Sequence, residues 1–266
     1  MAKNQLHIIK IGGNVIDNSE NLHHFLKDFS ALKGLKILVH GGGKIATQLS
    51  AELGIEPKLV EGRRITDIET LRVVTMVYGG LVNKNIVAQL QQAGNNALGL
   101  TGADGNFIRA KKRPVKTIDY GFVGDIDEHS IDPDSLARLL DAGFTPVFCA
   151  ITHDGHGQLL NTNADTIASA LAVALARLYD TTLIYCFEKK GVLRDIEDEN
   201  SVIGSIDPLT YEELKEEKVI HSGMLPKLDN AFTAINQGVS AVIIGRSDEL
   251  GNLKLGKAFG TKLSRQ

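Results

Sequence analysis

A lysine and two glycines come at the end of the first strand-like run of the chain. Leu6–Ile11 is apolar except for His7 and Lys10, and Gly12 and Gly13 follow it directly. Adjacent glycines let the backbone approach a ligand closely and can turn successive N–H groups toward an anion. The pattern predicts a phosphate-binding turn with a cation beside it. The simpler alternative is a lysine that reaches solvent before an ordinary turn.

A second glycine-rich turn, His40-Gly41-Gly42-Gly43-Lys44, follows the next apolar run and precedes a helical pattern. Backbone N–H groups and the positive end of the helix dipole would converge at the carboxyl edge of a parallel sheet, where open α/β sheets bind ligands. Two such turns side by side suit a phosphoryl group in transfer, because its oxygens gain charge that N–H groups and a lysine can stabilise.

The same turn also fits a dinucleotide-binding motif. Gly41, Gly43 and Ala46 match G-x-G-x-x-A, and Glu61 follows roughly 20 residues later, so a nicotinamide-dependent oxidoreductase is the alternative. Two features argue against it. One pyrophosphate needs one glycine turn rather than two, and Glu61 falls at the tip of a predicted hairpin instead of at a strand end.

Two further segments carry polar side chains directly before helical patterns. Asn161, Asn163 and Asp165 lie within five residues, which is more polarity than one helix cap requires, although at least one of them is expected to cap the helix. Gly223-Met224-Leu225-Pro226-Lys227 places a lysine in the first turn of a helix. A cation is disfavoured there unless it is solvated or held by an anion.

Arg63 and Arg64 are either a solvated surface pair or a clamp for a carboxylate. His153 and His156 lie in a glycine-rich turn without other ligands at suitable spacing, so no metal site is predicted. The chain has two cysteines, Cys149 and Cys186, each inside an apolar strand-like run. We interpret both as buried thiols of the core.

The composition describes an ordinary globular chain of one large domain or two closely packed ones. The chain has 266 residues, 43% of them hydrophobic and 23% charged, and 29 Lys and Arg against 32 Asp and Glu give a net charge of −3. No global basic field exists to attract nucleic acid or an anionic membrane. No apolar run approaches the roughly 18 residues that a membrane span needs, so we expect a cytoplasmic protein without nucleic-acid or membrane partners.

Strand-like runs alternate with helical patterns, which is typical of an α/β protein with a largely parallel sheet. Glycine-punctuated segments between residues 99 and 126 are expected to form antiparallel strands at an edge, and a hairpin is expected at Pro57–Thr66 with its tip at Glu61 and Gly62. We place a lobe boundary near Arg177, giving lobes of residues 1–176 and 177–266. The remaining predicted elements are strands at 6–11, 36–39, 146–151, 182–186 and 241–244, and helices at 19–32, 44–53, 68–92, 132–142, 165–176, 208–218 and 225–237.

Taken in order, these segments closely resemble the N-acetylglutamate kinase branch of the amino acid kinase family. The resemblance covers nearly the whole chain and rests on five motifs: Lys10-Ile11-Gly12-Gly13, His40-Gly41-Gly42-Gly43, Gly62-Arg63-Arg64-Ile65-Thr66, Asn161-Thr162-Asn163-Ala164-Asp165 and Gly223-Met224-Leu225-Pro226-Lys227. The first is shared across the family, and the last three narrow it to acylglutamate. The resemblance implies an open three-layer α/β/α sandwich with a mainly parallel central sheet, an N-terminal lobe for the acylated amino acid and a C-terminal lobe for ATP.

The resemblance also implies a role for each motif. Lys10 and Lys227 would stabilise the transferring phosphoryl group, and Asp165 would orient both lysines. Backbone donors would come from Gly12, Gly13, Gly42 and Gly43. Substrate would be held by Gly42, Gly43, Arg64, Asn161 and Asn163, and nucleotide by Glu188, Gly191, Val192, Leu193, Gly223, Met224 and Lys227. Mg²⁺ would enter with ATP, without a metal site of the protein.

The chain departs from the family at one turn. Family members carry an aspartate in a D-V-x-G-[VI] turn that opens the nucleotide lobe, whereas this chain has Phe187-Glu188-Lys189-Lys190-Gly191-Val192. We expect Glu188 to take the place of the aspartate.

The resemblance leaves the acyl group open. N-acetyl-L-glutamate and N-succinyl-L-glutamate are both candidates, and a sensor of the same fold without turnover is a further alternative. The first strand begins near Leu6 without a preceding helix. In this respect the chain resembles the arginine-insensitive homodimers of the family.

Overall fold

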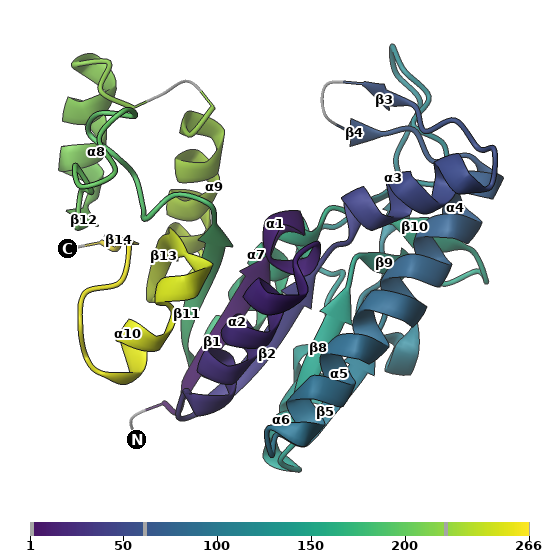
Figure 1. Ribbon diagram of the computed structural model, residues 1–266, viewed down its shortest axis with the longest axis horizontal. Helices are drawn as coiled ribbons and strands as arrows, with labels where there is room; N and C mark the ends of the chain where they lie inside the picture. Colours follow the sequence, from purple (N-terminus) through teal and green to yellow (C-terminus); the bar gives the residue numbers. More distant parts are fainter. Residues whose placement is uncertain (1–2, 61–62, 221–222, 266) are drawn as a thin grey trace.

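The computed structural model describes residues 3–60, 63–220 and 223–265. Its centre is an eight-stranded sheet in the order β12-β14-β13-β11-β1-β2-β8-β5 (Figure 1). Every neighbouring pair is parallel except β13 and β14, which are antiparallel. In this order the strands are Ser205–Ile206, Thr261–Leu263, Ala241–Arg246, Asp180–Phe187, Gln5–Ile11, Leu35–His40, Thr145–Cys149 and Ala97–Leu100.

Helices cover both faces of this sheet, which confirms the three-layer α/β/α architecture. α6, α7, α8 and α9 pack on one face, and α1, α2, α3, α4, α5 and α10 pack on the other. The helices are α1 Gly13–Ile16, α2 Ser19–Ala31, α3 Gly43–Glu52, α4 Ile68–Val74, α5 Asn83–Gln92, α6 Pro133–Asp141, α7 Ala164–Ala176, α8 Pro208–Glu216, α9 Leu225–Asn236 and α10 Gly251–Lys254.

The strands are buried on both faces because successive side chains point to opposite sides of a sheet. In β1, Leu6 and Ile8 pack toward α7, whereas Ile9 and Ile11 join the core on the opposite face. The same alternation places Lys10 on the α7 side. The charged side chain of Lys10 therefore enters a layer that is otherwise apolar, close to the carboxyl end of the strand.

The predicted long helix at 68–92 is continuous but changes its winding. α4 and α5 are joined by a π-helical segment, Thr75–Val82, which contains Gly79 and Gly80. A Cβ added at Gly79 would lie 3.6 Å from the methyl carbon of Thr101. The wider π turn is a feature that helical periodicity does not reveal.

The segments between residues 99 and 126 follow the prediction in part. β6 (Lys111–Lys112) and β7 (Gly124–Asp125) pair antiparallel, as expected. The prediction was wrong for β5, which pairs parallel with β8 at the sheet edge. A crossover through α6 joins β5 to β8, and a right-handed crossover of this kind yields parallel neighbours. Short 3₁₀ turns occur at Asp104–Asn106 and Ser247–Glu249.

Two short hairpins lie beside the sheet. β3 (Leu59–Val60) and β4 (Arg63–Arg64) form the predicted hairpin, whose expected tip at Glu61 and Gly62 lies outside the described residues. β9 (Ile151–His153) and β10 (Leu159–Asn161) form a second hairpin that leads into α7. No helix in the described part of the chain is long and apolar enough to cross a membrane.

Candidate active site

Both glycine turns lie where strands β1 and β2 end, side by side in the sheet. α1 begins at Gly13 and α3 at Gly43, so each turn presents the start of a helix at the same edge. Gly42 has a φ of +152°, and an ideal Cβ there would lie 3.0 Å from the Tyr78 ring. A residue with a side chain would be strained at this position, so the close approach of backbone to the site depends on glycine.

The ring of His40 holds the second glycine turn in place through two hydrogen bonds. The side chain is fully buried, its Nδ1 lies 2.8 Å from the Gly41 carbonyl oxygen, and its Nε2 lies 3.0 Å from Nδ2 of Asn83. A carbonyl oxygen only accepts, so Nδ1 carries the proton and Nε2 accepts from the amide. Burial lowers the pKa of His40 to about 4, which keeps the imidazole neutral.

Lys10 and Asp165 form an ion pair at the centre of the site. The Lys10 Nζ lies 2.7 Å from Oδ1 of Asp165, although the two residues are 155 positions apart in sequence. Lys10 is only 9% exposed, and Asp165 lies in the first turn of α7. Asn163 caps this helix by accepting from the Thr166 N–H at 3.0 Å, which confirms that one of the three polar residues has a capping role.

Lys227 approaches the same place from α9, in the other half of the molecule. Its Nζ lies 3.9 Å from the centroid of the Phe187 ring. Burial lowers the pKa of Lys227 and the charge of Lys10 lowers it further, whereas the carboxylates of Asp165 and Glu188 oppose these effects. An ammonium in this position is stabilised by any anion that enters.

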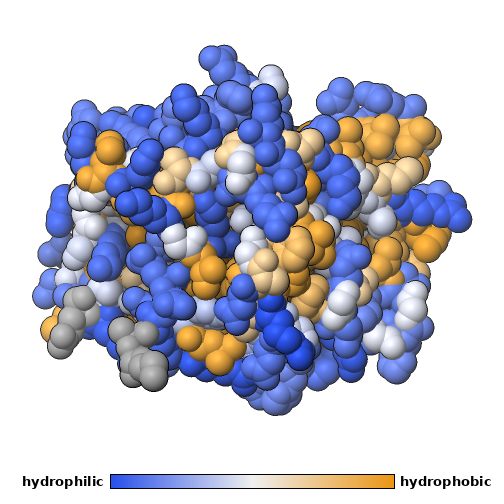
Figure 2. Space-filling view, turned by 90° about the horizontal axis from the view of Figure 1, so that it is seen from below, coloured by the Kyte–Doolittle hydropathy of each residue, from blue (hydrophilic) through white to orange (hydrophobic). Residues whose placement is uncertain are grey.

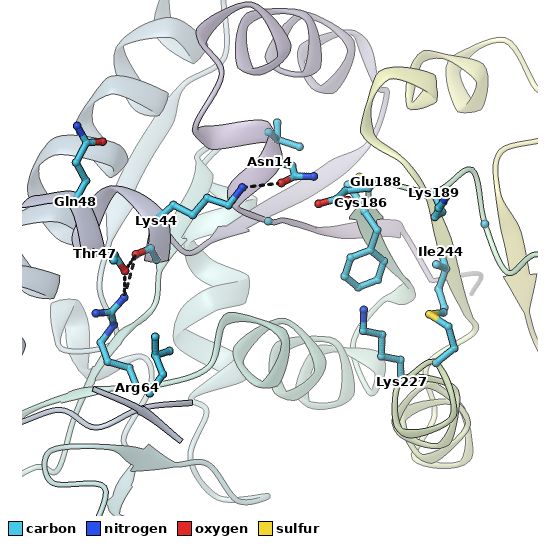
Figure 3. A pocket seen from close by; sticks show the side chains of 18 residues that line it. Asn14, Lys44, Thr47, Gln48, Arg64, Cys186, Glu188, Lys189, Lys227 and Ile244 are labelled. Carbon is cyan, nitrogen blue, oxygen red and sulfur yellow. Dashed lines mark hydrogen bonds between the residues drawn. The ribbon is translucent and has the colours of Figure 1, made fainter. Parts of the chain in front are cut away.

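Two cavities meet at this point. The first has a volume of about 810 Å³ and the second about 950 Å³, and the linings of both include Gly43, Leu59, Arg64 and Lys227. Figure 3 shows Arg64 and Lys44 reaching into the first cavity from one side, and Lys227 and Glu188 from the other. Two ligands could therefore lie side by side with Lys227 and the second glycine turn between them.

Arg64 has donor capacity left for a ligand. One nitrogen, Nη2, donates to the Gly43 carbonyl at 3.0 Å and to Oγ1 of Thr47 at 2.6 Å. The other, Nη1, is buried and has no hydrogen-bond partner within the described ranges. A buried guanidinium nitrogen without an acceptor is costly unless a ligand supplies one. Asn161 also lines the second cavity and donates to Oγ1 of Thr66 at 3.0 Å.

The predicted nucleotide residues separate into two groups. Glu188, Gly191 and Met224 line the first cavity, Gly223 lines the second, and Lys227 lines both. The glycines Gly12 and Gly13, predicted to bind phosphate, also line the first cavity. Val192 lies in the core at 2% exposure, and its N–H donates to Oγ1 of Thr261 at 2.8 Å. Leu193 forms an isolated β-bridge with Val202. Neither Val192 nor Leu193 lines either cavity.

Sequence reasoning missed several residues of the first cavity. Asn14, Lys44, Thr47 and Gln48 line it, and Lys44 donates to Oδ1 of Asn14 at 3.1 Å. Their proximity to the glycine turns was the available signal. Phe187 was noticed only as part of a sequence departure, yet its ring lies in the cavity beside Lys227.

The two cysteines are buried, as predicted, and burial raises the pKa of each thiol to about 12. Among the residues that the structure describes, no group of three or more His, Cys, Asp or Glu side chains could hold a metal ion.

The sequence profile described as "Amino acid kinase family" matches residues 5–245. The chain belongs to this family. It is 61% identical over 261 residues to a protein of Cytophaga hutchinsonii named acetylglutamate kinase, covering 97% of this chain and 98% of the relative. A protein of the same name from Phocaeicola vulgatus is 59% identical over 242 residues, covering 91% and 93%.

Solved structures agree with the fold of the family. The smu.665 protein of Streptococcus mutans superimposes with a TM-score of 0.75 at 28% identity, covering 98% of this chain and 99% of that one. Membership of the amino acid kinase family argues against the nicotinamide-dependent oxidoreductase.

Proposed function

We propose that the chain transfers the γ-phosphoryl group of ATP to the γ-carboxylate of N-acetyl-L-glutamate, giving N-acetylglutamyl 5-phosphate and ADP. This is the second step of arginine biosynthesis. The observation that carries the proposal is the pair of cavities that meet at Gly43 and Lys227, because a direct transfer requires donor and acceptor side by side. The names of the most similar relatives support the choice of acceptor.

The chemistry needs charge neutralisation rather than a base. A γ-carboxylate oxygen is already an anion; it forms a bond to the γ-phosphorus while the bond to the bridging oxygen breaks, and ADP leaves with that electron pair. Lys10 and Lys227 would face the equatorial oxygens, and the N–H groups of Gly12, Gly13, Gly42 and Gly43 would add donors. Mg²⁺ would arrive bound to the phosphates of ATP and supply further positive charge.

Asp165 would hold Lys10 in place through the 2.7 Å ion pair. It would also bring the two lysines together, because its charge stabilises the ammonium of Lys227 as well. The second cavity would take the acylglutamate, with Nη1 of Arg64 and the amide of Asn161 on its carboxylates and Asn163 beside them. The first cavity would take ATP along Glu188, Gly191 and Met224. Gly223 would contribute at the junction, and Val192 and Leu193 would support this turn from the core side.

The two lobes follow the same division. Residues 1–176 would hold the acylated amino acid and residues 177–266 the nucleotide, with the sheet continuous between them through β1 and β11. The cytoplasmic location remains a prediction from the sequence.

A homodimer is the assembly we propose. Met76 and Leu81, in the π-helical segment between α4 and α5, are each 53% exposed. β5 is the edge of the sheet on the same side of the molecule (Figure 1). Figure 2 shows hydrophobic residues gathered mainly in the right-hand half, toward the end that carries α5 and β5 in Figure 1. Pairing of two chains across this end would cover both the exposed side chains of Met76 and Leu81 and the sheet edge at β5.

The test is ADP release measured with N-acetyl-L-glutamate, N-succinyl-L-glutamate and free glutamate as acceptors. We expect the highest kcat/KM with N-acetyl-L-glutamate and negligible turnover with glutamate. A preference for the succinyl compound would keep the reaction and change the acyl group. Ligand-induced thermal stabilisation without ADP release would indicate a sensor instead of an enzyme.

A further inference from the structure

One aromatic ring lies close to both lysines of the site. The Phe187 ring centroid is 3.9 Å from Nζ of Lys227 and 5.5 Å from Nζ of Lys10. Both distances fall within the roughly 6 Å over which an ammonium is attracted to the negative face of an aromatic ring. The ring is held in turn by Tyr185, two residues earlier on β11, with the centroids 5.9 Å apart and an interplanar angle of 17°.

The fold places these groups together for simple reasons. Tyr185 and Phe187 share a face of β11 because side chains two apart in a strand point the same way. Tyr185 is the register partner of Lys10 on the neighbouring strand β1. Its hydroxyl donates to the Asp165 carbonyl oxygen at 3.3 Å, so the aromatic pair is attached to the helix that carries the ion-pair partner of Lys10.

The charge balance explains why a ring is useful here. The carboxylate of Asp165 is paired directly with Lys10 at 2.7 Å, whereas Asp165 and Glu188 act on Lys227 only through their charges. Lys227 is therefore the less closely paired of the two ammonium groups, and both its burial and the charge of Lys10 act against its charged form. A ring face attracts an ammonium without forming the strong directed bond that a carboxylate would make, so Lys227 stays charged and remains available to a phosphoryl oxygen.

We propose that Phe187 is a positioning residue that holds Lys227, and to a lesser degree Lys10, by cation–π attraction at the place where the phosphoryl group passes. This inference rests on the proposed function and assigns a role to a residue outside the motifs of the family resemblance. Its consequence is that the electron density of the ring, and not only its volume, sets the rate of phosphoryl transfer.

The experiment replaces Phe187 with 4-fluoro-, 3,5-difluoro- and pentafluorophenylalanine by nonsense suppression. Fluorine withdraws electron density from the ring face in steps with little change of size. We expect log kcat for ADP release to fall steadily along the series, by roughly 2- to 30-fold in total, the range of a cation–π attraction. KM for the acylglutamate should stay nearly constant, because Arg64 and Asn161 are untouched.

The chain offers a matched control in the same lobe. Phe232 is buried and stacked on Tyr211 at a centroid distance of 5.0 Å, and it lines neither of the two site cavities. The same fluorinated residues at position 232 should leave kcat unchanged. Among ordinary variants, Phe187→Leu should lose rate and Phe187→Trp should retain it. A flat fluorine series at 187, or an equal fall at 232, would overturn the proposal.

A second measurement needs no turnover. In protein labelled with ¹³C at lysine Cε, the resonance of Lys227 is assigned by its loss in Lys227→Arg and then titrated. Because the ring stabilises the ammonium form, the pKa of Lys227 should fall as fluorines are added at 187. If the wild type releases no ADP with any acylglutamate, the proposed function fails. A Lys227 titration that does not respond to fluorine at 187 refutes the inference whether or not the wild type turns over.

Discussion

Two lysines that lie far apart in the chain, Lys10 and Lys227, both lie near the Phe187 ring and the carboxylate of Asp165. We expect Lys10→Ala and Lys227→Ala each to lower kcat by roughly 10² to 10³, because each removes a charge that is needed most in the transition state. Steady-state ADP release measures this, and circular dichroism checks the fold. Lys215→Ala is the control, since Lys215 is exposed on α8 and pairs with Glu212 on the same helix. Retention of more than about a third of the wild-type rate would contradict a contribution of this size to the barrier.

Arg64 is the second prediction at the residue level. Arg64→Lys should raise KM for the acylglutamate by roughly 10- to 100-fold, because a lysine has no second nitrogen to offer the substrate while the first donates to Gly43 and Thr47. KM for ATP should change little. Arg72→Lys, on an exposed arginine of α4 that pairs with Glu69 at 2.7 Å, should change neither value. Equal effects of Arg64→Lys on both substrates would place Arg64 outside the acceptor site.

At the level of elements, the buried hydrogen bond between His40 of β2 and Asn83 of α5 makes the stability of the protein depend on pH. The pKa of His40 is about 4 in the folded protein and 6.5 when unfolded, so the unfolded chain binds the proton first as pH falls. The contribution of His40 to the free energy of unfolding is complete above pH 6.5 and is lost as pH falls toward 4. The loss amounts to about 3 kcal/mol at 1.36 kcal/mol per pKa unit.

Urea unfolding of the wild type and of His40→Gln between pH 4 and 8 measures this difference. The wild type should lose stability across the interval more steeply than His40→Gln, which has no group titrating at this position. His156→Gln, at an exposed histidine of the β9–β10 turn, should keep the wild-type slope. Parallel curves for the wild type and His40→Gln would show that the imidazole takes up its proton without disturbing the turn.

At the scale of the whole molecule, we expect a homodimer through the end formed by α4, α5 and β5. The wild type should give the mass of two chains by light scattering at micromolar concentration. The double variant Met76→Glu/Leu81→Glu should be a monomer, because two charges would be buried without partners. Leu209→Glu, on the 79% exposed Leu209 of α8, should remain a dimer. A wild-type monomer would refute this assembly.

The sequence alone determined most of the longer strands and helices, and it showed that glycine turns follow β1 and β2. Apolar periodicity and the glycines after Ile11 and His40 are local signals, and local signals fix local structure. The resemblance added the proposed roles of Lys10, Asp165 and Lys227, because motifs can be matched one by one along a sequence.

Tertiary structure alone decided which of these groups meet. The ion pair of Lys10 with Asp165 joins β1 to α7, and the ring of Phe187 reaches Lys227 through the arrangement of β11 and α9. The three-residue strand β14 pairs antiparallel with β13. β5 pairs parallel with β8, although an antiparallel strand was predicted there. Strand direction and contacts between distant residues follow from crossovers and from burial on both faces of the sheet. No window of sequence contains both partners of such a contact, so periodicity and spacing could not have supplied them.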